Sequence, residues 1–200
     1  MASFDTVPAA GACVAAIIAD GVVPAAMEFM DRRAAEAIED FNQPGYPKGA
    51  EAILIIDADG VEADVTHAVS RVIDIVAQCG GKTVEAIDEK PRARIWSGRK
   101  AAFAAMGRLA PDMICMDGTI PKRALPRVLN AIGELSKAYG LRCMNVFHAG
   151  DGNLHPLILY DANREGELER TEAFGAEILK LSIEVGGTIT GEHGVGVEKI

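Results

Sequence analysis

The chain has 200 residues, of which 49% are hydrophobic and 24% are charged, a composition typical of one globular domain or two small fused ones. Its net charge of −9 argues against nucleic acid and anionic membrane surfaces as partners, although a few local cations suffice to bind an anionic substrate. No stretch reaches the roughly 18 apolar residues that a membrane span needs, and no transmembrane segment is expected.

The cysteine pattern and the start of the chain both predict a cytoplasmic protein. The four cysteines lie in apolar segments without a Cys-x-x-Cys pair, which is typical of buried, reduced thiols: Cys13, Cys79, Cys115 and Cys143. The first residues lack the basic region and apolar core of a secretory signal. Both ends look cut, so we expect the chain to be part of a longer polypeptide.

The first half of the chain mixes helical and strand patterns. Valine and isoleucine recur at helical spacing between Val61 and Val76, and Gly80-Gly81 ends that helix. The elements expected here are helices at 6–20, 31–40, 61–76 and 90–109, and strands at 25–30, 52–57 and 83–87.

The second half has clearer boundaries. Pro126 suits the first turn of a helix, and Gly186-Gly187 stops another. The elements expected are a strand at 112–117, a helix at 125–139, strands at 141–149 and 154–160, a helix at 167–185 and a strand at 188–190.

These orders predict an α+β fold of two fused ferredoxin-like (βαββαβ) repeats, residues 1–110 and 111–200. The first repeat lacks its initial strand in this interpretation, since the expected helix at 6–20 follows the start of the chain directly. We expect antiparallel sheets with helices on one face. The repeat rests on element order alone, because the halves share no convincing sequence identity.

The segment from His148 to His155 reads HAGDGNLH and predicts a metal site. Asp151-Gly152 between two apolar strands predicts a two-residue hairpin, which would pair His148 with His155. Side chains paired in this way have Cβ atoms about 4.5–5.5 Å apart on one face, so both imidazoles could bind one Zn, Mn or Fe ion. The alternative is a solvated pair of histidines.

The segment from Thr190 to Gly196 reads TGEHGVG and could supply a third ligand. Its glycines let the backbone approach a ligand closely. In an extended segment Glu192 and His193 point to opposite sides, so Glu192 could complete a His, His, Glu set with open positions. The alternative is an ordinary Gly-rich turn, and sequence alone does not show that the two segments meet.

Together, these two segments resemble the signature of the FAD-linked oxidase C-terminal domain. That domain is found in glycolate oxidase flavin subunits, D-lactate dehydrogenases and D-2-hydroxyglutarate dehydrogenases. The segments 96–99 (WSGR) and 117–121 (DGTIP) also resemble the glycolate oxidase branch. The resemblance spans essentially the whole chain.

The resemblance implies a role for each motif residue. It implies that His148, His155 and Glu192 bind a divalent metal, that His193 is the catalytic base and that Arg99 holds the substrate carboxylate. From residues alone, Arg99 fits a solvated helix face better. Trp96 fits core packing better than a functional role.

The resemblance also implies a flavin-dependent 2-hydroxyacid dehydrogenase whose FAD is bound mainly by a separate flavin domain of the same polypeptide. We find no Gly-rich flavin-phosphate loop here, so this chain alone is expected to be inactive. Leu157 and Cys115 replace polar substrate contacts of the 2-hydroxyglutarate branch, which favours glycolate or D-lactate. An electron-acceptor subunit is a further expected partner.

Two other functions remain open from the sequence. The chain could be a non-catalytic ferredoxin-like module that binds metal or a small ligand. It could also be a metal-assisted hydrolase that activates water on the same His, His, Glu set. Only the oxidoreductase requires a flavin domain on the same polypeptide.

Overall fold

The structure is a computed structural model that describes residues 1–196 and 199. Its first half contains β1 (Ala2–Phe4), α1 (Val7–Ala19), β2 (Ala26–Asp31), α2 (Arg32–Asn42), β3 (Ala52–Asp57), α3 (Glu62–Gln78), β4 (Lys82–Thr83), α4 (Glu89–Lys100) and α5 (Ala102–Met106). Its second half contains β5 (Asp112–Cys115), β6 (Gly118–Thr119), η1 (Lys122–Ala124), α6 (Leu125–Tyr139), β7 (Arg142–His148), β8 (Asn153–Leu154), β9 (Pro156–Tyr160), α7 (Glu167–Glu184) and β10 (Thr188–Ile189).

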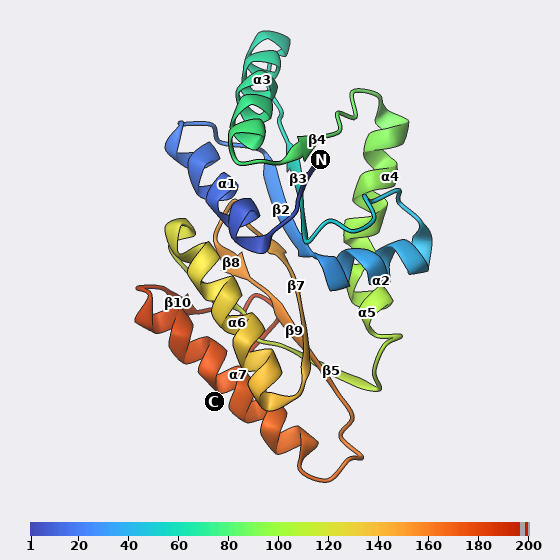
Figure 1. The fold of residues 1–200 in the computed structure, drawn as a ribbon, viewed down its shortest axis with the longest axis vertical. Coiled ribbons are helices and arrows are strands. Elements are labelled where there is room, and N and C mark those ends of the chain that lie inside the picture. Colours follow the sequence, from blue (N-terminus) through green and yellow to red (C-terminus); the bar gives the residue numbers. More distant parts are fainter. Residues whose placement is uncertain (197–198, 200) are drawn as a thin grey trace.

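The strands form one antiparallel sheet that runs through both halves of the chain (Figure 1). Its order is β10-β6-β8-β7-β2-β3-β1-β4, and β5 and β9 pair with each other beside β7. The two halves join where β2 pairs with β7, with Glu28 opposite His148 and Phe29 opposite Phe147. The predicted α+β class and antiparallel pairing are confirmed.

The prediction that the first half lacks its initial strand is wrong. Residues Ala2–Phe4 form β1, which pairs antiparallel with both β3 and β4. Ala2 and Phe4 are buried, and Ser3 between them is half-buried. Three residues are too few for an alternating pattern to stand out in a sequence, and only the two flanking strands identify this one.

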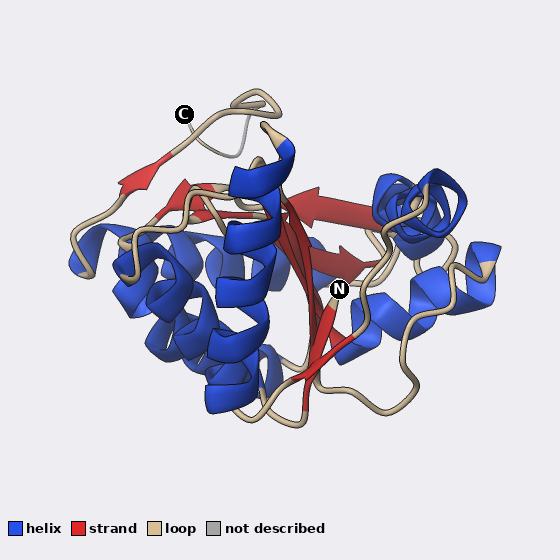
Figure 2. Ribbon diagram, turned by 90° about the horizontal axis from the view of Figure 1, so that it is seen from above, coloured by secondary structure: helices blue, strands red, loops and turns tan. Residues whose placement is uncertain are grey.

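The prediction of helices on one face of the sheet is also wrong, because helices cover both faces (Figure 2). One core cluster contains residues of α1, α3, α6 and α7 together with Phe29 and Phe147, whose rings stack at 4.7 Å. The second contains residues of α2, α4 and α5 together with Met30 and Val146. Successive side chains of a strand face opposite sides, so β2 and β7 contribute to both cores.

Local signals explain where several helices begin and end. The Thr6 side chain caps α1 by accepting a hydrogen bond from the backbone of Ala9. Pro126 lies in the first turn of α6, as predicted, and Gly140 ends that helix in the left-handed conformation. Among residues 1–196 and 199, no helix is both long and apolar enough to cross a membrane.

All four cysteines are free thiols, as the sequence predicts. Cys13 and Cys143 are buried, whereas Cys79 and Cys115 are partly exposed. Burial, together with the neighbouring Cys79, raises the pKa of Cys13 to about 12. This thiol is therefore held in its protonated, unreactive form.

Candidate metal and substrate site

The hairpin between β7 and β8 differs from the predicted two-residue turn. Its loop spans residues 149–152, and His148 pairs with Asn153 instead of His155. Within this loop only Gly152 has a positive φ, whereas a type I′ turn needs two such residues. The predicted register was therefore wrong by two residues.

The two histidines nevertheless share one face of the sheet. A strand alternates faces with a period of two, so a two-residue shift in register leaves every side chain on its original face. The rings of His148 and His155 lie 5.1 Å apart and nearly perpendicular. The prediction that they lie close together is correct, although it was reached through an incorrect register.

Glu192 reaches both rings from the loop after β10. Its Oε2 lies 3.0 Å from Nε2 of His155, and its Oε1 lies 3.7 Å from Nε2 of His148. Asn153 holds this loop by donating to the Glu192 carboxylate and accepting from the Thr190 hydroxyl. His148, His155 and Glu192 each offer one ligand atom, and these atoms all lie within 4.8 Å of one another.

The surroundings of these three groups suit a divalent cation. His155 is 1% exposed, and burial, followed by the nearby His193, lowers its pKa. A lowered pKa favours the neutral imidazole, which is the form that binds metals. Two imidazoles and one carboxylate fit Zn, Mn or Fe and leave coordination positions open.

Glu28, which our sequence reasoning missed, lies beneath His148. Its side chain is 7% exposed, and its Oε1 lies 2.7 Å from Nδ1 of His148. Its other oxygen, Oε2, accepts a hydrogen bond of 2.8 Å from Nε of Arg99. The available signal was an acid between Met27 and Phe29 in an apolar strand, but its partners depend on the pairing of β2 with β7.

Arg99 lies in the last turn of α4 and is not on a solvated helix face, since its side chain is 12% exposed. Gly98 allows α4 to approach the loop before β3, because a Cβ at that position would overlap the Tyr46 hydroxyl. Trp96 packs against the second core cluster, as expected. In the described chain, neither terminal nitrogen of Arg99 has a hydrogen-bond partner, so both remain available to an anion.

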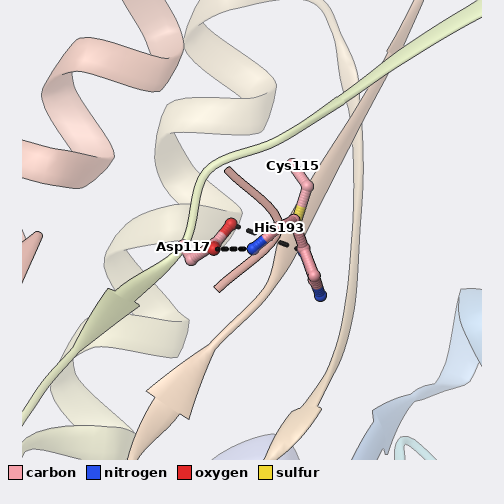
Figure 3. Close-up of side chains that lie close together, drawn as sticks. All are labelled: Cys115, Asp117 and His193. Carbon is pink, nitrogen blue, oxygen red and sulfur yellow. Dashed lines mark hydrogen bonds and ion pairs between the residues drawn. The ribbon is translucent and has the colours of Figure 1, made fainter. Parts of the chain in front are cut away.

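His193 lies against the side chain of Asp117 (Figure 3). The backbone N–H of His193 donates to Asp117 Oδ2 at 3.3 Å, and Nδ1 of its ring lies 3.6 Å from Oδ1. The His193 ring also lies 4.5 Å from that of His155 and 5.5 Å from that of Phe103. The loop is a turn closed by Gly194 and Gly191, not an extended segment, so Glu192 and His193 both contact His155.

Cys115, Asp117 and His193 form a second set of possible metal ligands, but they suit a cation less well. The Lys199 ammonium lies 3.4 Å from the buried Asp117 Oδ1 and already supplies a positive charge there. Burial opposes ionisation of Asp117, yet the His193 backbone N–H and Lys199 together lower its pKa. Burial and Asp117 raise the pKa of Cys115, which therefore stays a thiol.

Comparison with known proteins identifies relatives over the whole chain. It is 56% identical to the glycolate oxidase subunit GlcD of Escherichia coli (strain K12), over 100% of this chain and 40% of that protein. It is 36% identical to GlcD of Bacillus subtilis (strain 168), over 100% of this chain and 43% of that protein. It is 30% identical to the mitochondrial D-lactate dehydrogenase [cytochrome] of Kluyveromyces lactis, over 98% of this chain and 35% of that protein.

Solved structures show the same fold at low sequence identity. A 4-ethylphenol oxidase from Gulosibacter chungangensis matches with a TM-score of 0.63 and 14% identity, over 94% of this chain and 44% of that one. An alkyldihydroxyacetonephosphate synthase matches with a TM-score of 0.65 and 13% identity, over 98% and 40%.

This chain spans about two fifths of the length of the curated GlcD proteins. The family described as "FAD linked oxidases, C-terminal domain" matches residues 1–200. The chain therefore belongs to that family.

Proposed function

We propose that this chain is the substrate- and metal-binding part of an FAD-dependent enzyme that oxidises a small 2-hydroxy acid, glycolate or D-lactate, to the 2-oxo acid. The FAD is bound mainly by a flavin domain elsewhere on the same polypeptide. The names of the relatives, glycolate oxidase subunit and D-lactate dehydrogenase, support this substrate class. An electron-acceptor subunit and a cytoplasmic location complete the proposal.

One observation carries the proposal: three groups that can bind a metal, two from the β7–β9 hairpin and one from the loop after β10, converge beside a histidine and a largely buried arginine. His148, His155 and Glu192 surround a common point. The ring of His193 packs against that of His155. Arg99 is linked to the same cluster through Glu28. This arrangement offers a cation site, a proton acceptor and a carboxylate binder in one place.

Each group has a defined task in the oxidation. Arg99 binds the substrate carboxylate through its two terminal nitrogens, since Nε is occupied by Glu28. His193 takes the proton of the substrate hydroxyl at Nε2, because Nδ1 faces Asp117. A divalent metal, when bound by the three ligands, supplies Lewis acidity at that hydroxyl. FAD, when bound, supplies the acceptor for the hydride that leaves the α-carbon.

Two positions support a small monocarboxylate over a diacid. Leu157 is fully buried on β9, and the Cys115 thiol stays neutral. Neither can neutralise a second carboxylate. A substrate with one carboxylate needs only Arg99, whereas a diacid needs a second cation, so we propose glycolate or D-lactate.

We also propose that the two halves, 1–110 and 111–200, are ferredoxin-like repeats. In the first half the strands run in the order β4-β1-β3-β2. In the second half β10, β6, β8 and β7 follow the equivalent order, with β5 and β9 continuing β6 and β8 toward the other end of the sheet. These orders agree with the βαββαβ topology, with α2, α4 and α5 as additions.

The test uses the full-length protein that contains this chain. We expect flavin absorbance, bound Zn, Mn or Fe, and turnover of glycolate or D-lactate in preference to D-2-hydroxyglutarate. A clear preference for the diacid, or a protein without flavin, would overturn the proposal.

A variant of Glu192 tests the metal set directly. Glu192→Gln removes the anionic ligand and should lower metal content, whereas Glu177→Gln alters an exposed acid that pairs with Lys180 on α7 and should not. Normal metal content in Glu192→Gln would remove this residue from the ligand set.

A further inference from the structure

Glu28 is a buried acid in contact with the site, and both of its oxygens are used. Its carboxylate lies between Nδ1 of His148 at 2.7 Å and Nε of Arg99 at 2.8 Å. A buried carboxylate is costly unless it is paired and hydrogen-bonded, and these two contacts satisfy it. Neither partner comes from its own strand, since His148 is on β7 and Arg99 is on α4.

One oxygen of Glu28 acts on the proposed metal ligand. A histidine binds a metal through one nitrogen only if the proton lies on the other, and a carboxylate that accepts this proton orients the ring. Nδ1 of His148 lies 2.7 Å from Glu28 Oε1, and a carboxylate oxygen can only accept, so this contact favours the tautomer with its proton on Nδ1 and its lone pair on Nε2, the atom that faces Glu192. The pairing of Glu28 with His148 across β2 and β7 brings these two side chains to one face.

The other oxygen of Glu28 acts on the proposed substrate binder. A single hydrogen bond at Nε fixes the plane of a guanidinium group and leaves both terminal nitrogens on its outer edge. Arg99 therefore presents two parallel donors, which is the geometry that binds a carboxylate in bidentate fashion.

We propose that Glu28 is a positioning residue that sets the tautomer of His148 and the plane of Arg99 at once, and so ties metal binding to carboxylate binding. This inference deepens the proposed function and rests on it for the substrate. Glu28 comes from the first half of the chain, whereas all three metal ligands come from the second. The metal site is therefore complete only when the β2–β7 seam is formed.

The Glu28→Gln substitution separates this role from simple packing. A glutamine has nearly the same shape but offers one acceptor and one donor, whereas His148 and Arg99 both require an acceptor. If its oxygen faces Arg99, its NH₂ group forces the proton of His148 onto Nε2 and blocks the metal. If its oxygen faces His148, the NH₂ group opposes Nε of Arg99 and misplaces the guanidinium.

The experiment compares wild-type and Glu28→Gln full-length protein in two measurements. Metal-free protein is titrated with Zn²⁺ or Mn²⁺ against a chelator, and we expect roughly 10- to 100-fold weaker affinity, the range for lost partners of metal-bound histidines. KM for glycolate or D-lactate in saturating metal should rise about tenfold or more, since a bidentate contact is lost. Thermal midpoints verify that the variant is folded.

A matched control lies on the other face of the sheet. Asp20 binds Nε and Nη2 of Arg71 with its two oxygens, so Asp20→Asn also breaks a carboxylate–guanidinium pair. It should leave metal affinity and KM at wild-type values. If Glu28→Gln fails to fold, Glu28→Asp keeps the charge but is one methylene too short to reach both partners, and should weaken both measurements.

The outcomes are distinct. A folded Glu28 variant with weaker metal affinity and raised KM supports the joint role. Wild-type values in both measurements overturn it. Because a glutamine can satisfy one partner at the expense of the other, a change in only one measurement passes the decision to Glu28→Asp, in which wild-type metal affinity or wild-type KM overturns the joint role. Failure of the proposed function would instead appear as absent turnover in the wild-type protein. The metal titration measures the effect of Glu28 on metal affinity and does not depend on turnover.

Discussion

Gly152 ends the loop between His148 and Asn153, and replacing it by alanine should be unusually costly for the stability of the fold. Its φ of 72° lies in the left-handed region, which costs an L-residue about 1–2 kcal/mol. A Cβ at this position would also overlap the carbonyl oxygen of Ile120 on the neighbouring segment. Two separate penalties therefore act at one residue.

The cost of the overlap with Ile120 follows from the contacts between the two segments. The Ile120 N–H donates to the Gly152 carbonyl at 2.9 Å, and both residues are buried. Relieving the overlap requires the two backbones to move apart, which breaks this bond and leaves buried polar groups unpaired, at about 1–3 kcal/mol. Alanine regains about 0.4–1 kcal/mol by restricting the unfolded chain. The net loss is about 1–5 kcal/mol.

Gly140 is the matched control for this substitution. Its φ of 65° is similar, and a Cβ there would meet no atom within 4 Å. Gly140→Ala should therefore cost only the backbone difference, about 1 kcal/mol. Urea denaturation of the 200-residue chain, followed by circular dichroism, measures both variants. Equal losses in the two variants would refute the argument from close approach.

Three further predictions follow from the contacts described above. Asp117→Asn should lower kcat in the full-length enzyme far more than it raises KM, because Asp117 orients His193 and not the substrate; a change confined to KM would contradict this. Phe147→Ala should destabilise the 200-residue chain by about 3–5 kcal/mol in the same urea assay, since Phe147 is fully buried and stacked on Phe29; a loss below about 1 kcal/mol would be inconsistent with that packing. The hydrogen bond from Arg71 lowers the pKa of Asp20, so this pair should stabilise the chain at pH values above the unfolded pKa of about 3.9 and lose that effect as the pH falls through the lowered folded-state pKa. Asp20→Asn should therefore reduce the free energy of unfolding at pH 7 but not near pH 2. An effect of this substitution that does not change with pH would argue against the ion pair.

The histidine pair illustrates how much a pattern can predict when its details are wrong. The sequence predicted a two-residue turn with His148 opposite His155, whereas the structure has a four-residue loop with His148 opposite Asn153. The conclusion that both rings lie on one face of the sheet is still correct, because side chains alternate faces every two residues and the register was wrong by two residues. An error of one residue would have placed the rings on opposite faces.

Local signals in the sequence determined most of the helices, the central strands, and the two Gly-rich segments around His148 and Glu192. Each depends on neighbours within a few residues, such as apolar spacing, a cap or a stop. The three-residue strand β1 is too short to carry such a local signal, because its position is set by pairing with β3 and β4.

Only the tertiary structure decided which elements became neighbours. Alternation tells which side chains of a strand share a face, but it does not tell which strand lies beside it, and β2 and β7 are about 120 residues apart in the chain. That pairing places Glu28 opposite His148, and the close approach of α4 through Gly98 brings Arg99 to the same carboxylate. The role of a buried acid in an apolar strand cannot be inferred from the strand itself. Burial of the carboxylate alone is unfavourable, and the contacts that compensate for it come from residues distant in the sequence.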